Sequence, residues 1–160
     1  MSVLIRRGSP SDLAQVQRLN QALFKHERDA GFYEGELFNV QWPYEQAGTH
    51  YFTACLGSSK SSSLFLATSG REPVCYLAGS SSSKSYLLSN PIAEIENMFV
   101  EAEYRDKGIG GQLVQAFIEW ARAAGAARLR VGAFAKNSEA IRFYERNAFE
   151  PHELILEQSL

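Results

Sequence analysis

The sequence has little of several features that define specialised protein classes. Its 160 residues include two cysteines, Cys55 and Cys75, which are too few for a disulfide framework and favour a reducing compartment. No apolar run approaches the roughly 18 residues of a membrane span. The N-terminus lacks the apolar core and small-residue cleavage site of a signal peptide. We therefore expect a cytoplasmic protein with no membrane partner.

The chain also lacks an excess of charge of either sign. It has 16 Lys and Arg against 18 Asp and Glu, a net charge of −2. Binding to a phosphate backbone favours a basic protein, so we expect no nucleic-acid partner. The three histidines, His26, His50 and His152, have no metal-ligand spacing, so we expect no metal. The composition, 45% hydrophobic and 21% charged, is that of one globular domain over residues 1–160.

The order of the apolar patterns predicts a mixed α+β fold. Strands are expected at Val3–Arg6, Leu64–Thr68, Val74–Ser80, Ile92–Glu101 and Arg128–Phe134, with a last strand or strand pair in Phe149–Gln158. Helices are expected from Pro10 to about Gly31, from Pro43 to Gly57, from the turn at Gly108 to about Ala124, and from Asn137 to about Arg146. We expect a mixed sheet of about six to seven strands, an antiparallel meander followed by a β-α-β crossover, flanked by about four helices.

The segment that points to chemistry is a glycine-rich loop between a strand and a helix. It reads Arg105-Asp106-Lys107-Gly108-Ile109-Gly110-Gly111. A helix N-terminus presents free N–H groups and partial positive charge, which suit a phosphate. A dinucleotide-binding loop would need a third glycine where this chain has Leu113, and a P-loop in residues 79–85 would need one where it has Ser83. Both of those nucleotide-binding motifs are therefore disfavoured.

A second motif stands in the last predicted helix, Asn137-x-x-Ala140-x-x-Phe143-Tyr144. Together with Arg105-x-x-Gly108-x-Gly110, it resembles the acetyl-CoA loop and C-terminal helix of the GNAT superfamily of N-acetyltransferases. The run Ile95–Val100 before Tyr104-Arg105 is similar to that of the polyamine (diamine) acetyltransferase branch. The resemblance implies a GNAT-like fold over the whole chain.

The resemblance also implies the activity and the cofactor contacts. In this family an amine attacks the thioester of acetyl-CoA directly within a ternary complex. The main chain beside residues 98–100 would pair with the pantetheine arm like an added strand. The implied contacts to acetyl-CoA are Met98, Phe99, Val100, Arg105, Asp106, Lys107, Gly108, Ile109, Gly110, Gly111, Asn137, Ala140 and Tyr144.

Proton transfer requires a base and an acid. An amine with a pKa of about 10 is mostly protonated at neutral pH, so the acceptor must lose a proton before it attacks. The resemblance makes Glu96 the preferred base or water-orienting residue, with Glu94 as second choice, and Tyr144 the acid that protonates the leaving thiolate. Strand alternation places both glutamates on one face with Met98 and Val100.

Two positions depart from the family pattern. Asp106 stands where the family commonly has glycine, beside the expected pyrophosphate. Ala148 stands where a glycine usually ends the tyrosine helix. A left-handed cap suits glycine or asparagine, so we expect Asn147 to take that conformation.

The family usually binds the acceptor between its first two helices, here roughly residues 24–44. Glu27, Phe32, Tyr33 and Trp42 supply a carboxylate and aromatic rings, which attract cations. This favours a small polyamine-like or lysine-like amine. Protein N-termini or lysines, and a non-catalytic acetyl-CoA sensor, remain alternatives. The family also implies a possible homodimer.

Overall fold

The first helix begins at a compact cluster of polar residues. The computed structural model describes residues 2–32, 39–84, 86 and 91–160. The carboxylate of Asp12 accepts hydrogen bonds from the Ser9 N–H at 2.8 Å and from Arg6 at 2.7 and 2.8 Å. These bonds fix the short 3₁₀ turn η1 (Pro10–Asp12) and the start of α1 (Leu13–Asp29) against β1 (Val3–Arg7).

The other elements follow the expected order along the chain. They are η3 (Trp42–Tyr44), α2 (Gln46–Gly57), β2 (Ser62–Ser69), β3 (Glu72–Ser82), β4 (Ile92–Val100), η4 (Ala102–Tyr104), α3 (Ile109–Ala123), β5 (Arg128–Val131) and α4 (Ser138–Arg146). The four α-helices of the described residues lie close to their predicted bounds. β5 is shorter than predicted, because it ends at Val131 rather than Phe134.

The strands form one mixed sheet in the order β1-β2-β3-β4-β5. The first four strands pair antiparallel, and β5 pairs parallel to β4 after the crossover through α3. This topology confirms the predicted meander followed by a β-α-β crossover. The described residues contain five strands in this sheet, fewer than the six to seven predicted.

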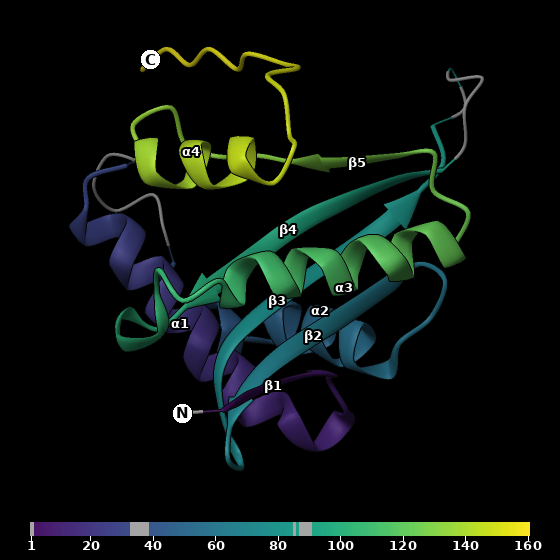
Figure 1. Ribbon diagram of the computed structural model, residues 1–160. Helices are drawn as coiled ribbons and strands as arrows, with labels where there is room; N and C mark the ends of the chain where they lie inside the picture. The colour runs from purple at the N-terminus through teal and green to yellow at the C-terminus, as the bar shows by residue number, and fades with distance from the viewer. Residues whose placement is uncertain (1, 33–38, 85, 87–90) are drawn as a thin grey trace.

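Helices cover both faces of this sheet (Figure 1). On one face α3 contributes Leu113, Phe117 and Trp120 to a buried cluster with residues of β2, β3 and β4. On the other face, α1 and α2 bury Val16, Phe52 and their neighbours against the opposite sides of β2, β3 and β4. The sheet is therefore the middle layer, and side chains of β4 are buried on both of its faces.

The predicted last strand is wrong for the described structure. Residues 151–160 form no helix or strand, and all are exposed. A strand needs a hydrogen-bonding partner. The tail runs apart from the sheet, above α4 in the view of Figure 1. The consecutive apolar residues Leu154, Ile155 and Leu156 thus remain unpaired with the sheet, and each is at least 76% exposed.

Candidate active site

The glycine-rich loop opens the N-terminus of α3 through two left-handed residues. Asp106 has φ 57° and Gly108 has φ 75°. The first α-type bond of the helix runs from the Gln112 N–H to the Gly108 carbonyl, at 3.2 Å. The N–H groups before Gln112 therefore have no partner within the helix. The positive φ of Asp106 explains why the family commonly has glycine at this position, because a residue with a Cβ is strained there.

The side chains of the loop are held in different directions. Arg105 donates from Nε to the Val100 carbonyl at 3.0 Å, and its guanidinium lies 5.7 Å from the ring centroid of Phe99. Its cationic group is thus fixed at the end of β4. Lys107 instead donates to the Glu103 carbonyl at 2.6 Å. The Lys107 ammonium is therefore turned back toward η4.

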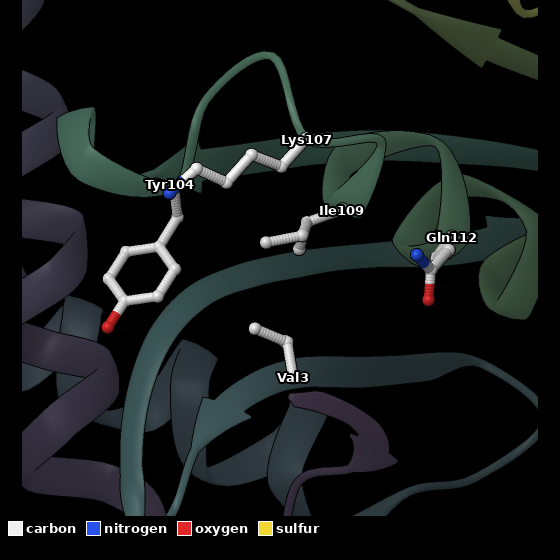
Figure 2. A pocket seen from close by; sticks show the side chains of 5 residues that line it. All are labelled: Val3, Tyr104, Lys107, Ile109 and Gln112. Atoms are coloured by element: carbon white, nitrogen blue, oxygen red, sulfur yellow. The ribbon is translucent and has the colours of Figure 1, made fainter. Parts of the chain in front are cut away.

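A hollow of about 310 Å³ lies beside this loop, on the side of β1. Figure 2 shows its lining, which comes from Val3, Tyr104, Lys107, Ile109 and Gln112. None of the predicted proton-transfer residues lines it. The hollow is therefore separate from the residues expected to carry out the reaction.

A β-bulge in β4 places Glu96 on the face of the sheet that α1 and α2 cover, opposite α3. Asn97 pairs with Ala78 and Ile95 pairs with Gly79, so Glu96 is the extra residue. The extra residue shifts the alternation of the strand. Glu96 faces α2, whereas Met98 and Val100 pack toward α3. The expectation that both glutamates share a face with Met98 and Val100 is therefore wrong.

The carboxylate of Glu96 is held by two hydroxyl groups. Tyr51 in α2 donates to Oε2 at 2.6 Å, and Ser80 in β3 donates to Oε1 at 2.7 Å. Glu94 lies opposite Ser80 in the sheet and is exposed. The two predicted base candidates thus differ, because the structure gives Glu96 a fixed orientation.

A chain of buried and half-buried polar groups continues from Tyr51. Its hydroxyl accepts a hydrogen bond from Asn97 Nδ2 at 3.2 Å, and Asn97 Oδ1 accepts one from Asn20 Nδ2 at 3.2 Å. Asn20 is fully buried and also donates to the Tyr76 hydroxyl at 2.8 Å. This network connects α1, α2, β3 and β4 directly behind Glu96.

The edge of β4 beyond the bulge is open on the side of β5. Parallel pairing joins Ile92 through Ile95 to residues 128–131 and ends there. Among the described residues, Met98, Phe99 and Val100 have a strand partner in β3 alone. Main-chain groups at such an edge can pair with an extended ligand. This is the segment at which the pantetheine arm was predicted.

Helix α4 carries Tyr144 to this open edge. The Tyr144 hydroxyl lies 3.8 Å from Met98 Sδ. Burial, and then the negative charge of Glu27, raises the pKa of Tyr144 above its ordinary value. The phenol therefore remains protonated at neutral pH and can donate a proton. Asn137 caps this helix by accepting from the Ala140 N–H at 3.1 Å.

The end of α4 is a Schellman motif that fixes Tyr144. The Phe149 N–H bonds to the Tyr144 carbonyl at 3.0 Å, and the Ala148 N–H bonds to the Glu145 carbonyl at 3.1 Å. The rings of Phe149 and Tyr144 pack with centroids 5.4 Å apart. Ala148 has φ 67°, whereas Asn147 does not take the left-handed conformation. The expectation for Asn147 is therefore wrong, because its amide donates to the Phe143 carbonyl instead.

Two of the predicted acceptor residues, Glu27 and Phe32, lie on the side of the open edge of β4. Burial raises the pKa of Glu27 to about 7, and the charge of Glu27 acts on both Tyr76 and Tyr144. Phe32 stacks on Phe134 with centroids 6.3 Å apart, which links the end of α1 to the chain after β5.

The other two predicted acceptor residues differ in what the structure shows. Trp42 packs on Tyr51 with ring centroids 5.8 Å apart, so it lies next to the tyrosine that holds Glu96. Tyr33 lies outside the described residues.

Sequence reasoning missed the groups that hold Glu96. Tyr51 lies on an apolar helix face, and Ser80 stands in a serine-rich run, so neither has a local signal of function. They meet Glu96 only because α2 and β3 pack next to the bulge.

Two other features are absent from residues 2–32, 39–84, 86 and 91–160. No cluster of three His, Cys, Asp or Glu is placed to hold a metal ion, and no helix is long and apolar enough to span a membrane.

Sequence comparison finds a relative that matches about half of this chain. The chain is 32% identical over 84 residues to an uncharacterized N-acetyltransferase of Methanocaldococcus jannaschii. That match covers 52% of this chain and 37% of the relative, so it spans little more than a third of the relative's length.

Two solved structures show the same fold at low sequence identity. A mutant of the BH1408 protein of Bacillus halodurans has a TM-score of 0.82 at 19% identity, covering 98% of this chain and 99% of that one. The aminoglycoside N-acetyltransferase AAC(6')-Iy, determined in complex with CoA, has a TM-score of 0.77 at 16% identity, covering 99% of this chain and 95% of that one.

The family itself follows from a longer match. The model of the acetyltransferase (GNAT) family matches residues 21–149, which include the glycine-rich loop, the bulged strand and the tyrosine helix. The chain therefore belongs to the acetyltransferase (GNAT) family.

Proposed function

We propose that this chain transfers the acetyl group of acetyl-CoA to the primary amine of a small cationic acceptor. The observation that carries the proposal is the open edge of β4 after Ile95, with Glu96 at its start and Tyr144 beside Met98. The pantetheine arm pairs with this edge. The pyrophosphate lies at the N-terminus of α3, where the N–H groups before Gln112 are available.

The residues around this edge carry out two proton transfers. Glu96 accepts a proton from the acceptor ammonium, directly or through a water molecule, so that the neutral amine forms a bond to the thioester carbon. A main-chain N–H at residues 98–100 stabilises the negative charge on the carbonyl oxygen. The carbon–sulfur bond then breaks, and Tyr144 donates its proton to the leaving thiolate. The new amide nitrogen releases its second proton to solvent, from which Tyr144 is protonated again. Each proton transfer supplies about 10²- to 10⁴-fold.

The acceptor class follows from charge. Glu27, half-buried near Tyr144, and Glu96 place two carboxylates around the site, and the Trp42 ring packs on Tyr51, which holds Glu96. These groups favour a compact cation with more than one amine, such as a polyamine. The aminoglycosides named for the similar acetyltransferase structure are cations of another shape, so both belong in the test.

The test measures thiol release from acetyl-CoA with polyamines, lysine, peptides with free N-termini and aminoglycosides. We expect release that depends on a polyamine. Glu96→Gln and Tyr144→Phe should each lower turnover by about 10²-fold or more. Glu94→Gln tests the second-choice base and should lower turnover less than Glu96→Gln. Tyr86→Phe is the control for Tyr144→Phe, since Tyr86 is 80% exposed. Cofactor binding with no transfer to any amine would instead favour a sensor.

We also propose that the chain forms a homodimer through its C-terminal tail. The side chains of Leu154, Ile155 and Leu156 are 76%, 80% and 84% exposed, which is unusual for three consecutive apolar residues. Light scattering should give twice the mass of the chain. The triple substitution of these residues by serine should give one chain mass, and a monomeric parent protein would contradict the proposal.

A further inference from the structure

Tyr51 connects the acceptor side of the site to the carboxylate of Glu96. Its ring packs on Trp42 with centroids 5.8 Å apart, and on Phe52 at 5.0 Å in an edge-to-face arrangement. Its hydroxyl donates to Glu96 Oε2 at 2.6 Å. Burial is the largest cause of a pKa of Tyr51 raised well above its ordinary value. The hydroxyl therefore stays protonated and keeps its donor hydrogen throughout the physiological range.

The direction of that hydrogen is set by a third residue. Asn97 Nδ2 donates to the Tyr51 hydroxyl at 3.2 Å, which occupies an acceptor position of the oxygen. The single hydroxyl hydrogen is then free to point at Glu96. Asn97 is itself held by fully buried Asn20. The Tyr51 donor is thus fixed by Asn97 of β4, which is held in turn by Asn20 of α1.

The carboxylate keeps capacity for a further proton. Ser80 donates to Oε1 at 2.7 Å while Tyr51 donates to Oε2, so each oxygen of Glu96 holds one donor. A carboxylate has about four lone-pair sites, so each oxygen retains a free one. The arrangement suits a group that must be oriented before it accepts a proton.

We propose that Tyr51 is a positioning residue for proton transfer, holding the Glu96 carboxylate oriented next to the acceptor. This inference rests on the proposed function, in which Glu96 takes the proton of the amine. Loss of the Tyr51 hydroxyl leaves Oε2 without its donor and leaves the Glu96 carboxylate held by Ser80 alone. The chemical step should then slow.

The experiment compares Tyr51→Phe with Tyr86→Phe, which removes the hydroxyl of a tyrosine that is 80% exposed. We expect kcat of Tyr51→Phe to fall about tenfold, with KM for acetyl-CoA within about twofold of the parent. Tyr86→Phe should change neither constant. If Tyr51→Phe does not fold, Ser80→Ala removes the other donor of Glu96 and should lower kcat with KM for acetyl-CoA again unchanged.

A double variant separates positioning from a merely structural role. In the Glu96→Gln background, Tyr51→Phe should cause no further loss of kcat, because the two residues act through one carboxylate. An equal further loss, or an unchanged kcat in Tyr51→Phe, would overturn the role of Tyr51 while leaving the transferase intact. If the parent protein acetylates no amine, the proposed function fails, and the role of Tyr51 fails with it.

Discussion

Ala148 should be a point of backbone strain at the end of the helix that carries Tyr144. Its φ of 67° lies in the left-handed region, which costs a residue with a Cβ about 1–2 kcal/mol. Ala148→Gly removes that cost but adds about 0.5–1 kcal/mol of chain entropy to the unfolded state. The difference predicts a gain of about 0.5–1 kcal/mol in the free energy of unfolding. For a chain of this length that corresponds to a Tm increase of about 1–4 °C.

Thermal and urea unfolding followed by circular dichroism measure this gain. The matched control is Ala123→Gly, since Ala123 is an exposed alanine in the last turn of α3, where the backbone is helical. The same substitution there should lower stability by about 0.5–1 kcal/mol. A loss of stability in Ala148→Gly similar to that in Ala123→Gly would refute the reasoning. Turnover should stay within about twofold, because the Schellman hydrogen bonds that hold Tyr144 are made by main-chain atoms.

Three further predictions concern charge and packing. The hydrogen bond from Arg6 lowers the pKa of Asp12 to about 2. Asp12→Asn should therefore lower the free energy of unfolding at pH 7 by about 2 kcal/mol. In acid unfolding, the difference between variant and parent should vanish as the pH falls through about 2. Burial raises the pKa of Glu27 to about 7, so the free energy of unfolding should fall by about 2 kcal/mol as the pH rises from about 4.5 to 7. A pH–stability curve of Glu27→Gln that runs parallel to that of the parent would contradict this. A Cβ at Gly79 would overlap the Glu94 carbonyl and lie 2.6 Å from Phe117, so Gly79→Ala should cost about 3 kcal/mol or more, and a Tm within 2 °C of the parent would disprove that close contact.

Local signals in the sequence determined the helices, the loop and the family motifs. Ser9, Pro10 and Asp12 start the first helix, and Gly108 opens α3, because caps and turns act within a few residues. The glycine-rich loop and the tyrosine helix are short motifs whose residues are close in sequence. The meander and the crossover followed from the order of strands and helices, since connection lengths restrict how strands can pair.

Tertiary packing alone decided how the site is held. The bulge at Glu96 depends on the pairing of β4 with β3, and it reversed the expected face of the strand. Tyr51 and Ser80 reach Glu96 across separate elements, at sequence distances that no local pattern encodes. The tail after Phe149 carries a run of β-prone apolar residues, yet a strand forms only where an edge pairs with it. The sequence therefore indicated which residues to expect at the site, and the packing of α2, β3 and β4 decided how Glu96 is oriented.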